Sequence, residues 1–149
     1  MRAVVQRVKN ASVTVQGRSV GKIEKGLLVF LGISRQDTRQ DVLSLAARIA
    51  HLRIFADDRD LMNLSVLEIG GAILVVSQFT LYGDCRKGRR PSYADAAAPE
   101  LAKILYEDFI QAIKAFNIPV ASGEFQAMME VTLSNDGPVT LLLDSKKIF

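Results

Sequence analysis

Residues 26–33 form an uninterrupted apolar run, GLLVFLGI, which constrains the fold more than any other feature of the sequence. The run is far shorter than the roughly 18 to 20 apolar residues that a membrane-spanning helix needs. Leucine and valine between bounding glycines are typical of a strand that is buried on both faces. Residues 72–79 begin with a second apolar run and end in polar residues. We therefore expect a soluble protein whose core is built around central strands.

The length of the chain limits how that core can be organised. With 149 residues and no shift in composition along the sequence, we expect one domain spanning residues 1–149. Folding of a chain of this size hides about 68 to 70% of its unfolded surface. Hydrophobic residues make up 49% and charged residues 23% of the sequence. This composition predicts a stable core without disulfides or structural metals.

Few residues are available for metal or redox chemistry. The chain has one cysteine, Cys85, and one histidine, His51, which are too few for an internal disulfide or a structural zinc site. We therefore expect no metal and no cofactor. Near the N-terminus, Arg2 and Arg7 interrupt the sequence before an apolar signal segment can form, so we expect a cytoplasmic protein.

Strand-like patterns begin the chain. Residues 3–8 and 12–16 are rich in β-branched side chains. Gly17 and Arg18 then form a turn before residues 20–23, which predicts a hairpin in an antiparallel sheet.

The same alternation recurs near the C-terminus, in residues 128–134 and 139–143. Residues 135–138 separate the two segments, and all four residue types favour turns. We expect two strands joined at this turn. Met128 and Met129 would then point to opposite faces, so that at most one of them lines a pocket.

Two segments have helical periodicity. Thr38, followed three residues later by Asp41, resembles a capping box at the start of an amphipathic helix over residues 38–51. A second helix is expected to begin near Pro99 and to stop before Pro119. Strands, a helix, strands, a helix and strands in this order predict an α+β fold with mostly antiparallel pairing and two main helices. The order does not fit a regular dinucleotide-binding fold.

A polar segment follows the second apolar strand. Ser77, Gln78, Phe79 and Thr80 lie where that strand meets a loop, a common place for active-site groups. A hydroxyl nucleophile needs a base within hydrogen-bond reach, and the only histidine, His51, lies at the end of the first helix. A serine-hydrolase triad is therefore disfavoured. The alternative is that these hydroxyl groups only end a strand by bonding to nearby backbone.

The segment Asn135-Asp136-Gly137-Pro138 admits two interpretations. It can be only a hairpin turn, because each of its residues is common in turns. Proline directly after glycine, however, differs from the usual hairpin sequences. Such a bond can be cis at low cost and would then present two carbonyl oxygens on a rigid surface with few side chains. That surface could read the shape of a substrate.

Four cations occur within five residues, at Arg86, Lys87, Arg89 and Arg90. A solvated surface loop is the default interpretation of such a run, and contact with phosphates is the alternative. The position shortly after Thr80 favours phosphate contact. The net charge of +3 permits a polyanionic partner but does not require one.

The two polar segments together closely resemble the signatures of the D-aminoacyl-tRNA deacylase family. These signatures are a Ser-Gln-x-Thr segment and a Gly-Pro segment in an Asn-x-Gly-Pro-Val-Thr frame, which match residues 77–80 and 135–140. Two motifs in the right order are more specific than either alone. The resemblance extends over essentially the whole chain, through residues 6–8, 11–15, 62–64, 86–92 and 123–125.

The resemblance implies a homodimeric, barrel-like α+β enzyme without a cofactor. Its reaction would be hydrolysis of the ester between a D-amino acid, or glycine mischarged on tRNA(Ala), and the terminal adenosine of tRNA. In the family the Gly-Pro segment is cis and enters the pocket of the other subunit. Gly137 and Pro138 would then face residues 77–80 across the dimer and exclude L-aminoacyl-tRNA.

The resemblance also implies roles for individual residues. The catalytic residues would be Ser77, Gln78, Phe79 and Thr80. Backbone N–H groups near Phe79 and Thr80 would form an oxyanion hole, and Thr80 would be either a nucleophile or a positioning group. The substrate-binding residues would be Gly137, Pro138, Phe125, Met129 and Arg7. The tRNA-binding residues would be Arg86, Lys87, Arg89 and Arg90.

One departure from the family pattern concerns the pocket. Gln126 stands where a small residue is expected, so the dimensions of the pocket do not follow from the resemblance. The alternative function is a non-catalytic module that binds nucleic acid through the basic loop. A structural dimerisation domain is the third possibility.

Overall fold

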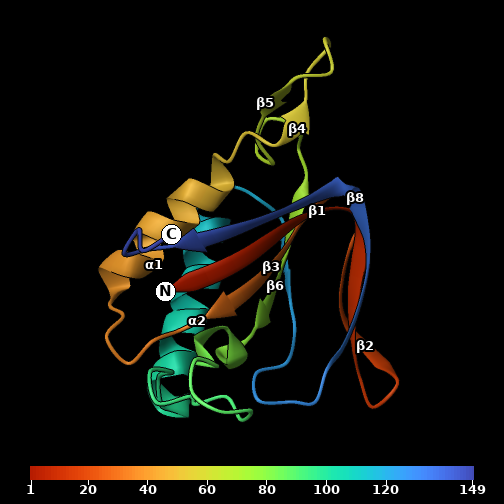
Figure 1. Ribbon diagram of the computed structural model, residues 1–149. Coiled ribbons are helices and arrows are strands. Elements are labelled where there is room, and N and C mark those ends of the chain that lie inside the picture. The colour runs from red at the N-terminus through yellow and green to blue at the C-terminus, as the bar shows by residue number, and fades with distance from the viewer.

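The computed structural model describes residues 1–149 and contains eight strands, two α-helices and one short 3₁₀ helix (Figure 1). In chain order the elements are β1 (Arg2–Val15), β2 (Arg18–Ile23), β3 (Gly26–Gly32), α1 (Arg39–Ala50), β4 (Phe55–Ala56), β5 (Met62–Leu64), β6 (Ala72–Ser77), η1 (Phe79–Tyr82), α2 (Pro99–Lys114), β7 (Val120–Ser122) and β8 (Glu130–Asp144). The expected α+β class with two main helices is confirmed. None of the helices is both long and apolar enough to cross a membrane.

The main sheet has six strands and is nearly closed. β1 pairs antiparallel with β2 and β3 on one side and with β8 on the other. β3, β6 and β7 then follow as parallel neighbours, and β7 lies against β2 so that the sheet almost returns to its start. Antiparallel pairing predominates as expected. The parallel pairs were not expected, and they direct the carboxyl ends of three strands to one edge of the sheet.

The strands at the two ends of the chain are longer than the sequence indicates. The predicted strands over residues 3–8 and 12–16 are one strand, β1, which pairs first with β3 and then with β2. The expected hairpin turn at residues 135–138 is wrong, because this segment lies inside β8. β8 pairs with β1 on both sides of the segment, and the extra residues are absorbed by shifts of register. The long ladder to β1 therefore prevails over the turn preference of these residues.

The helices follow their local signals closely. α1 has Thr38 as its N-cap, and the capping box with Asp41 is present. α2 begins at Pro99 and ends at Lys114, well before Pro119. His51 caps the end of α1 and packs edge-on against Phe116, so it takes no part in any cluster of catalytic groups.

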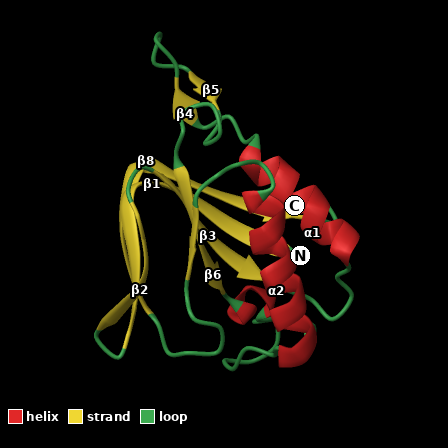
Figure 2. Ribbon diagram, turned by 180° about the vertical axis from the view of Figure 1, so that it is seen from behind, coloured by secondary structure: helices red, strands yellow, loops and turns green.

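Two apolar clusters fill the molecule. Both helices pack against one face of the sheet (Figure 2) and form the larger cluster of 23 buried residues. Seven further buried residues, among them Val13, Leu28 and Leu74, fill the space between β1, β2, β3 and β6. As predicted, β3 is buried on both faces, because each cluster covers one of them. The β4–β5 hairpin projects from the body beyond α1 (Figure 1).

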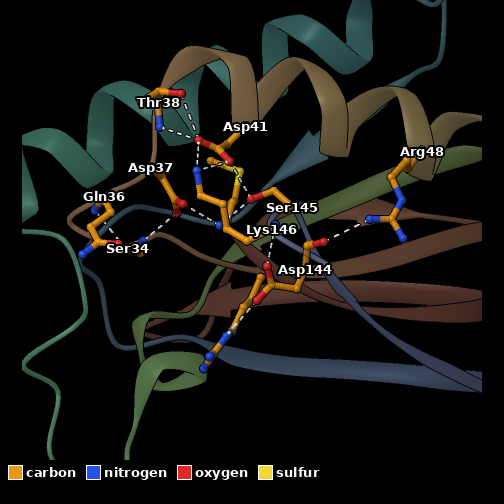
Figure 3. A network of polar contacts seen from close by, with 11 residues as sticks. Ser34, Gln36, Asp37, Thr38, Asp41, Arg48, Asp144, Ser145 and Lys146 are labelled. Carbon is orange, nitrogen blue, oxygen red and sulfur yellow. Dashed lines mark hydrogen bonds and ion pairs between the residues drawn. The ribbon is translucent and has the colours of Figure 1, made fainter. Parts of the chain in front are cut away.

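A network of polar contacts, here the terminal network, joins the start of β1, the start of α1 and the end of β8 (Figure 3). The fully buried ammonium group of Met1 lies 2.6 Å from Asp37 Oδ1 and donates to Ser145 Oγ at 2.8 Å. Ser145 Oγ in turn donates to Asp41 Oδ1, and Lys146 Nζ lies 2.8 Å from the same carboxylate. The two ends of the chain are thereby fixed to α1.

Asp144 extends the terminal network toward the sheet. Arg48 of α1 donates to its backbone carbonyl at 3.0 Å, and Arg2 lies 3.3 Å from its carboxylate. Burial by itself raises the pKa of Asp41, but hydrogen bonds from Lys146 and from its neighbours outweigh burial and hold that pKa well below its usual range. The Asp41 carboxylate is therefore charged and paired within the chain.

Candidate functional site

The carboxyl ends of the parallel strands β3 and β6 open into a hollow of about 780 Å³, here the strand-end hollow. Ligands of open α/β sheets bind outside such strand ends. Of the 18 residues that line the hollow, 14 are hydrophobic. Its walls come from the ends of β3 and β6, from residues 96–99 before and at the start of α2, and from residues 125–129 before β8. An apolar cavity with a few polar groups is typical of a small-molecule site.

The polar segment predicted from the sequence lies at the mouth of this hollow. Ser77 ends β6, and the backbone N–H of Gln78 donates to the carbonyl of Leu31 at 2.8 Å, which fixes the segment to β3. Ser77, Gln78 and Phe79 line the hollow. Thr80 does not line it, but its hydroxyl oxygen accepts a hydrogen bond from Gln78 Nε2.

Phe125 and Met129, predicted to wall the pocket, also line the hollow. Met129 lies so close to Gly123 that a Cβ on this glycine would be 2.5 Å from the methionine sulfur. Met128 also lines the hollow, although it is 92% exposed. The expectation that at most one of Met128 and Met129 lines a pocket is therefore wrong, because both residues precede β8, where the alternation of a strand does not apply. Gln126 stands at the rim with a φ of 63°, in the left-handed region.

The carbonyl of Val75 connects the wall formed by Phe125 and Met129 to the core. It accepts hydrogen bonds from the hydroxyl group of Tyr106 at 2.8 Å and from the N–H of Gly123 at 3.0 Å. The ring of Tyr106 also packs against Phe125, with centroids 5.8 Å apart. Burial raises the pKa of Tyr106 to about 12, so the hydroxyl group stays protonated and donates. Tyr106 is not among the residues predicted from the sequence, although a tyrosine within an apolar helical stripe is a signal for a buried hydroxyl group.

Residues 135–138 form the apex of β8. The Gly137–Pro138 bond is cis, and Gly137 has a φ of 122°, which disfavours any residue with a side chain. Arg7 Nε donates to the Asp136 carbonyl at 3.1 Å, and Arg7 also donates to the carbonyl of Ile54. Asn135 Nδ2 closes the apex by donating to the carbonyls of Arg7 and Val139.

The structure does not bring the apex of β8 to the hollow of its own chain. Arg7, Gly137 and Pro138 are absent from its lining. Both Gly137 and Pro138 are exposed. Within one chain the predicted site is therefore split into two parts, the strand-end hollow and the apex of β8.

The basic run lies on an exposed loop after η1. Backbone hydrogen bonds between Asp84 and Ser92 close the base of this loop. Arg86 pairs with Asp84 at 2.8 Å, and its hydrogen bonds lower the pKa of that carboxyl group. The other three cations have no ion-pair partner within the chain and are exposed: Lys87, Arg89 and Arg90. No three His, Cys, Asp or Glu side chains come together in a way that could hold a metal ion.

Fold and hollow together define a small α+β protein with a ligand-sized apolar site at the ends of its parallel strands. The family model described as D-Tyr-tRNA(Tyr) deacylase matches residues 4–144. The chain belongs to this family.

Curated relatives agree with this assignment, and solved structures share the fold. Proteins named D-aminoacyl-tRNA deacylase from Thermosipho africanus and Syntrophobacter fumaroxidans are each 62% identical to the chain over the full length of both proteins. A solved structure titled c-Myc DNA Unwinding Element Binding Protein is 38% identical, with a TM-score of 0.91 over 97% of this chain and 98% of that one. The fold is also that of a probable eukaryotic D-amino acid tRNA deacylase, with a TM-score of 0.80 at 19% identity over 95% of this chain and 97% of that one.

Proposed function

We propose that this protein hydrolyses the ester bond of D-aminoacyl-tRNA and releases the free D-amino acid and tRNA in the cytoplasm. The observation that carries the proposal is the position of Ser77, Gln78 and Phe79 at the mouth of an apolar hollow, in a chain that belongs to the deacylase family. The hollow is large enough for an aminoacyl group together with an adenosine. Phe125 and Met129 provide its apolar wall.

The chemistry would rest on backbone donors. Phe79 begins η1, and the first N–H groups of a helix have no carbonyl partner within it. The N–H groups of Phe79 and Thr80 can therefore stabilise the oxyanion that forms when water attacks the ester. Gln78 Nε2 donates a hydrogen bond to the hydroxyl oxygen of Thr80, and this contact orients the Thr80 hydroxyl group at the edge of the site. Without a nearby histidine, Thr80 acts as a positioning group, and the 2′-hydroxyl of the terminal ribose assists proton transfer.

Selectivity for the D-enantiomer would come from a second subunit. The apex of β8 is exposed and lies outside the hollow of its own chain, which is consistent with insertion into the hollow of another copy. Carbonyl oxygens of Gly137 and Pro138 of the partner subunit would hold the α-amino group and wall off the side where an L side chain projects. Glycine has no side chain and would pass this wall, so tRNA(Ala) mischarged with glycine would be a second substrate.

The basic loop would hold the rest of the tRNA. Lys87, Arg89 and Arg90 have no internal partner and can neutralise acceptor-stem phosphates. Arg86 can join them only in competition with Asp84. Because phosphate contacts release counterions, binding should weaken steeply as the salt concentration rises.

The decisive experiment is a deacylation time course on D-tyrosyl-tRNA and L-tyrosyl-tRNA, with spontaneous hydrolysis subtracted. Rapid release from the D substrate alone is expected. The matched variant is Gly137→Ala, because a Cβ there would meet Arg7 Nη2 at 2.8 Å on a backbone with positive φ. This variant should lose activity or selectivity while remaining folded. Equal release from both substrates by the unaltered protein would reject the chirality proposal.

A second candidate function is binding of nucleic acid without catalysis. It is favoured by the name of the structural relative with 38% identity, which describes a protein that binds a DNA element. The exposed cations of the loop would suffice for such binding. Binding of tRNA without release of either amino acid would support this candidate instead.

A further inference from the structure

Two aromatic side chains stand exposed at the mouth of the strand-end hollow. Phe79 is 57% and Tyr93 is 40% exposed, and both line the hollow. Their rings meet edge to face, with centroids 5.0 Å apart and planes at 66°. Burial of a ring is strongly favoured, so an exposed aromatic pair forgoes stabilisation that the fold could have used. Its exposure therefore calls for a ligand rather than a packing explanation.

The pair is held in place by its surroundings. Tyr93 packs against the backbone at Gly83, where a Cβ would lie 3.1 Å from Tyr93 Cε1. The backbone of Phe79 is held at the start of η1, and its ring packs against that of Tyr93. Edge-to-face packing also leaves ring surface free for a planar partner. The two rings thus form a preorganised apolar platform, which loses little conformational entropy when a ligand binds.

The platform adjoins two features with different chemistry. Ser77 and the apolar wall line the same hollow as the two rings. Tyr93 also directly follows Ser92, whose backbone bonds to Asp84 close the loop that carries the unpaired cations. The proposed ester site, an aromatic surface and a source of positive charge are therefore joined through Tyr93. A nucleotide chain has the matching order of a terminal residue, a planar base and phosphates.

We propose that Phe79 and Tyr93 form a stacking site for the nucleobase of the nucleotide that precedes the terminal adenosine, a cytosine in tRNA. The inference rests on the proposed function, because the terminal adenosine must occupy the hollow. The site is tolerant of base identity, since stacking uses the face of a ring and not its hydrogen-bonding edge. Such a role accounts for the exposure of both rings.

The test compares two small substrates, D-tyrosyl-adenosine and the corresponding D-tyrosyl ester of the dinucleotide cytidylyl-(3′→5′)-adenosine. For the unaltered protein, kcat/KM should be about 5- to 150-fold higher for the dinucleotide, the range that stacking of one base provides. Tyr93→Leu and Phe79→Leu should reduce this ratio toward one, mainly through KM. Tyr93→Phe keeps the ring and should keep the ratio. Ile104→Ala removes an apolar side chain that is 58% exposed on α2 and does not line the hollow, so it serves as the control.

Three outcomes would overturn the inference. A ratio near one in the unaltered protein would show that the second nucleotide makes no productive contact. An unchanged ratio in Tyr93→Leu would place that contact elsewhere. A loss of dimer in Tyr93→Leu, measured by sedimentation, would show that another copy of the chain covers the pair. If the unaltered protein hydrolyses neither these esters nor D-tyrosyl-tRNA, the proposed function itself fails, which is a distinct result.

Discussion

The terminal network and the strand-end hollow both gather polar groups, but they satisfy them differently. In the network, the Met1 ammonium, Asp37 and Asp41 are all buried and bonded within the chain. At the mouth of the hollow, Gln78 and Thr80 bond mainly to each other, and their remaining hydrogen-bonding capacity is open to solvent. The polar groups of the first region are satisfied within a single chain, whereas those of the second keep hydrogen-bonding capacity that the chain itself does not use.

The difference follows from the cost of burying charge. A buried charge without a partner is costly, so the groups of the network must find one another when the chain folds. Exposed groups at the hollow are hydrated before substrate arrives and can remain unpaired at little cost. Substitutions in the network should therefore lower the free energy of unfolding, and substitutions at the hollow should lower activity.

Asp37→Ala should have the largest effect on stability. It leaves the Met1 ammonium buried without its closest partner, which costs about 3 to 5 kcal/mol of unfolding free energy. Urea unfolding measures this loss, and kcat of the folded fraction should be unchanged. Asp95→Ala, which breaks an exposed ion pair with Arg35, is the control and should cost less than about 1 kcal/mol. If both variants lose the same free energy of unfolding, the buried network is no more important for stability than an exposed ion pair.

Asp41→Asn should cost about 2 kcal/mol at neutral pH, because the carboxylate accepts several charge-assisted hydrogen bonds. The folded-state pKa of Asp41 lies below its unfolded value, so its contribution is full above about pH 5 and is lost as the pH falls below about 4. Stability measured between pH 7 and pH 3 should therefore decline less steeply in the variant. If the free energy of unfolding declines equally with pH in both proteins, Asp41 does not contribute to the loss of stability in acid.

Thr80→Ala tests the hollow. If backbone donors carry the catalysis, kcat on D-tyrosyl-tRNA should fall by less than about tenfold. Because Thr80 is exposed, the free energy of unfolding should change by less than about 0.5 kcal/mol. Near-complete loss of activity with intact folding and tRNA binding would instead show that backbone donors do not carry the catalysis and that the Thr80 hydroxyl group is essential.

Tyr106→Phe tests a buried hydroxyl group that lies behind the wall of the hollow. The variant removes one hydrogen bond to the Val75 carbonyl, which keeps its bond from Gly123. A loss of about 1 kcal/mol in unfolding free energy is expected. Because the ring still supports Phe125, kcat/KM should change by less than about threefold. If kcat/KM falls by much more than threefold while the unfolding free energy falls by only about 1 kcal/mol, the Tyr106 hydroxyl group positions a residue of the hollow.

Several features of this protein were determined by the sequence alone. Thr38 with Asp41 and Pro99 define the starts of the helices, because capping and helical periodicity act within a few residues. The apolar run from Gly26 likewise predicts a strand covered on both faces. The polar segment after β6 could also be identified from its residues and position.

Only the tertiary structure decided the features that depend on distant pairing. The ladder between β1 and β8 places residues 135–138 inside a strand, although each of them favours a turn. Parallel pairing of β3, β6 and β7 gathers residues that are far apart in sequence around one hollow, with Tyr106 behind its wall, and leaves Gly137 outside it. Local preferences amount to a fraction of a kcal/mol per residue. The burial and hydrogen bonding of whole strands exceed them, so the final arrangement is set by contacts that no local pattern contains.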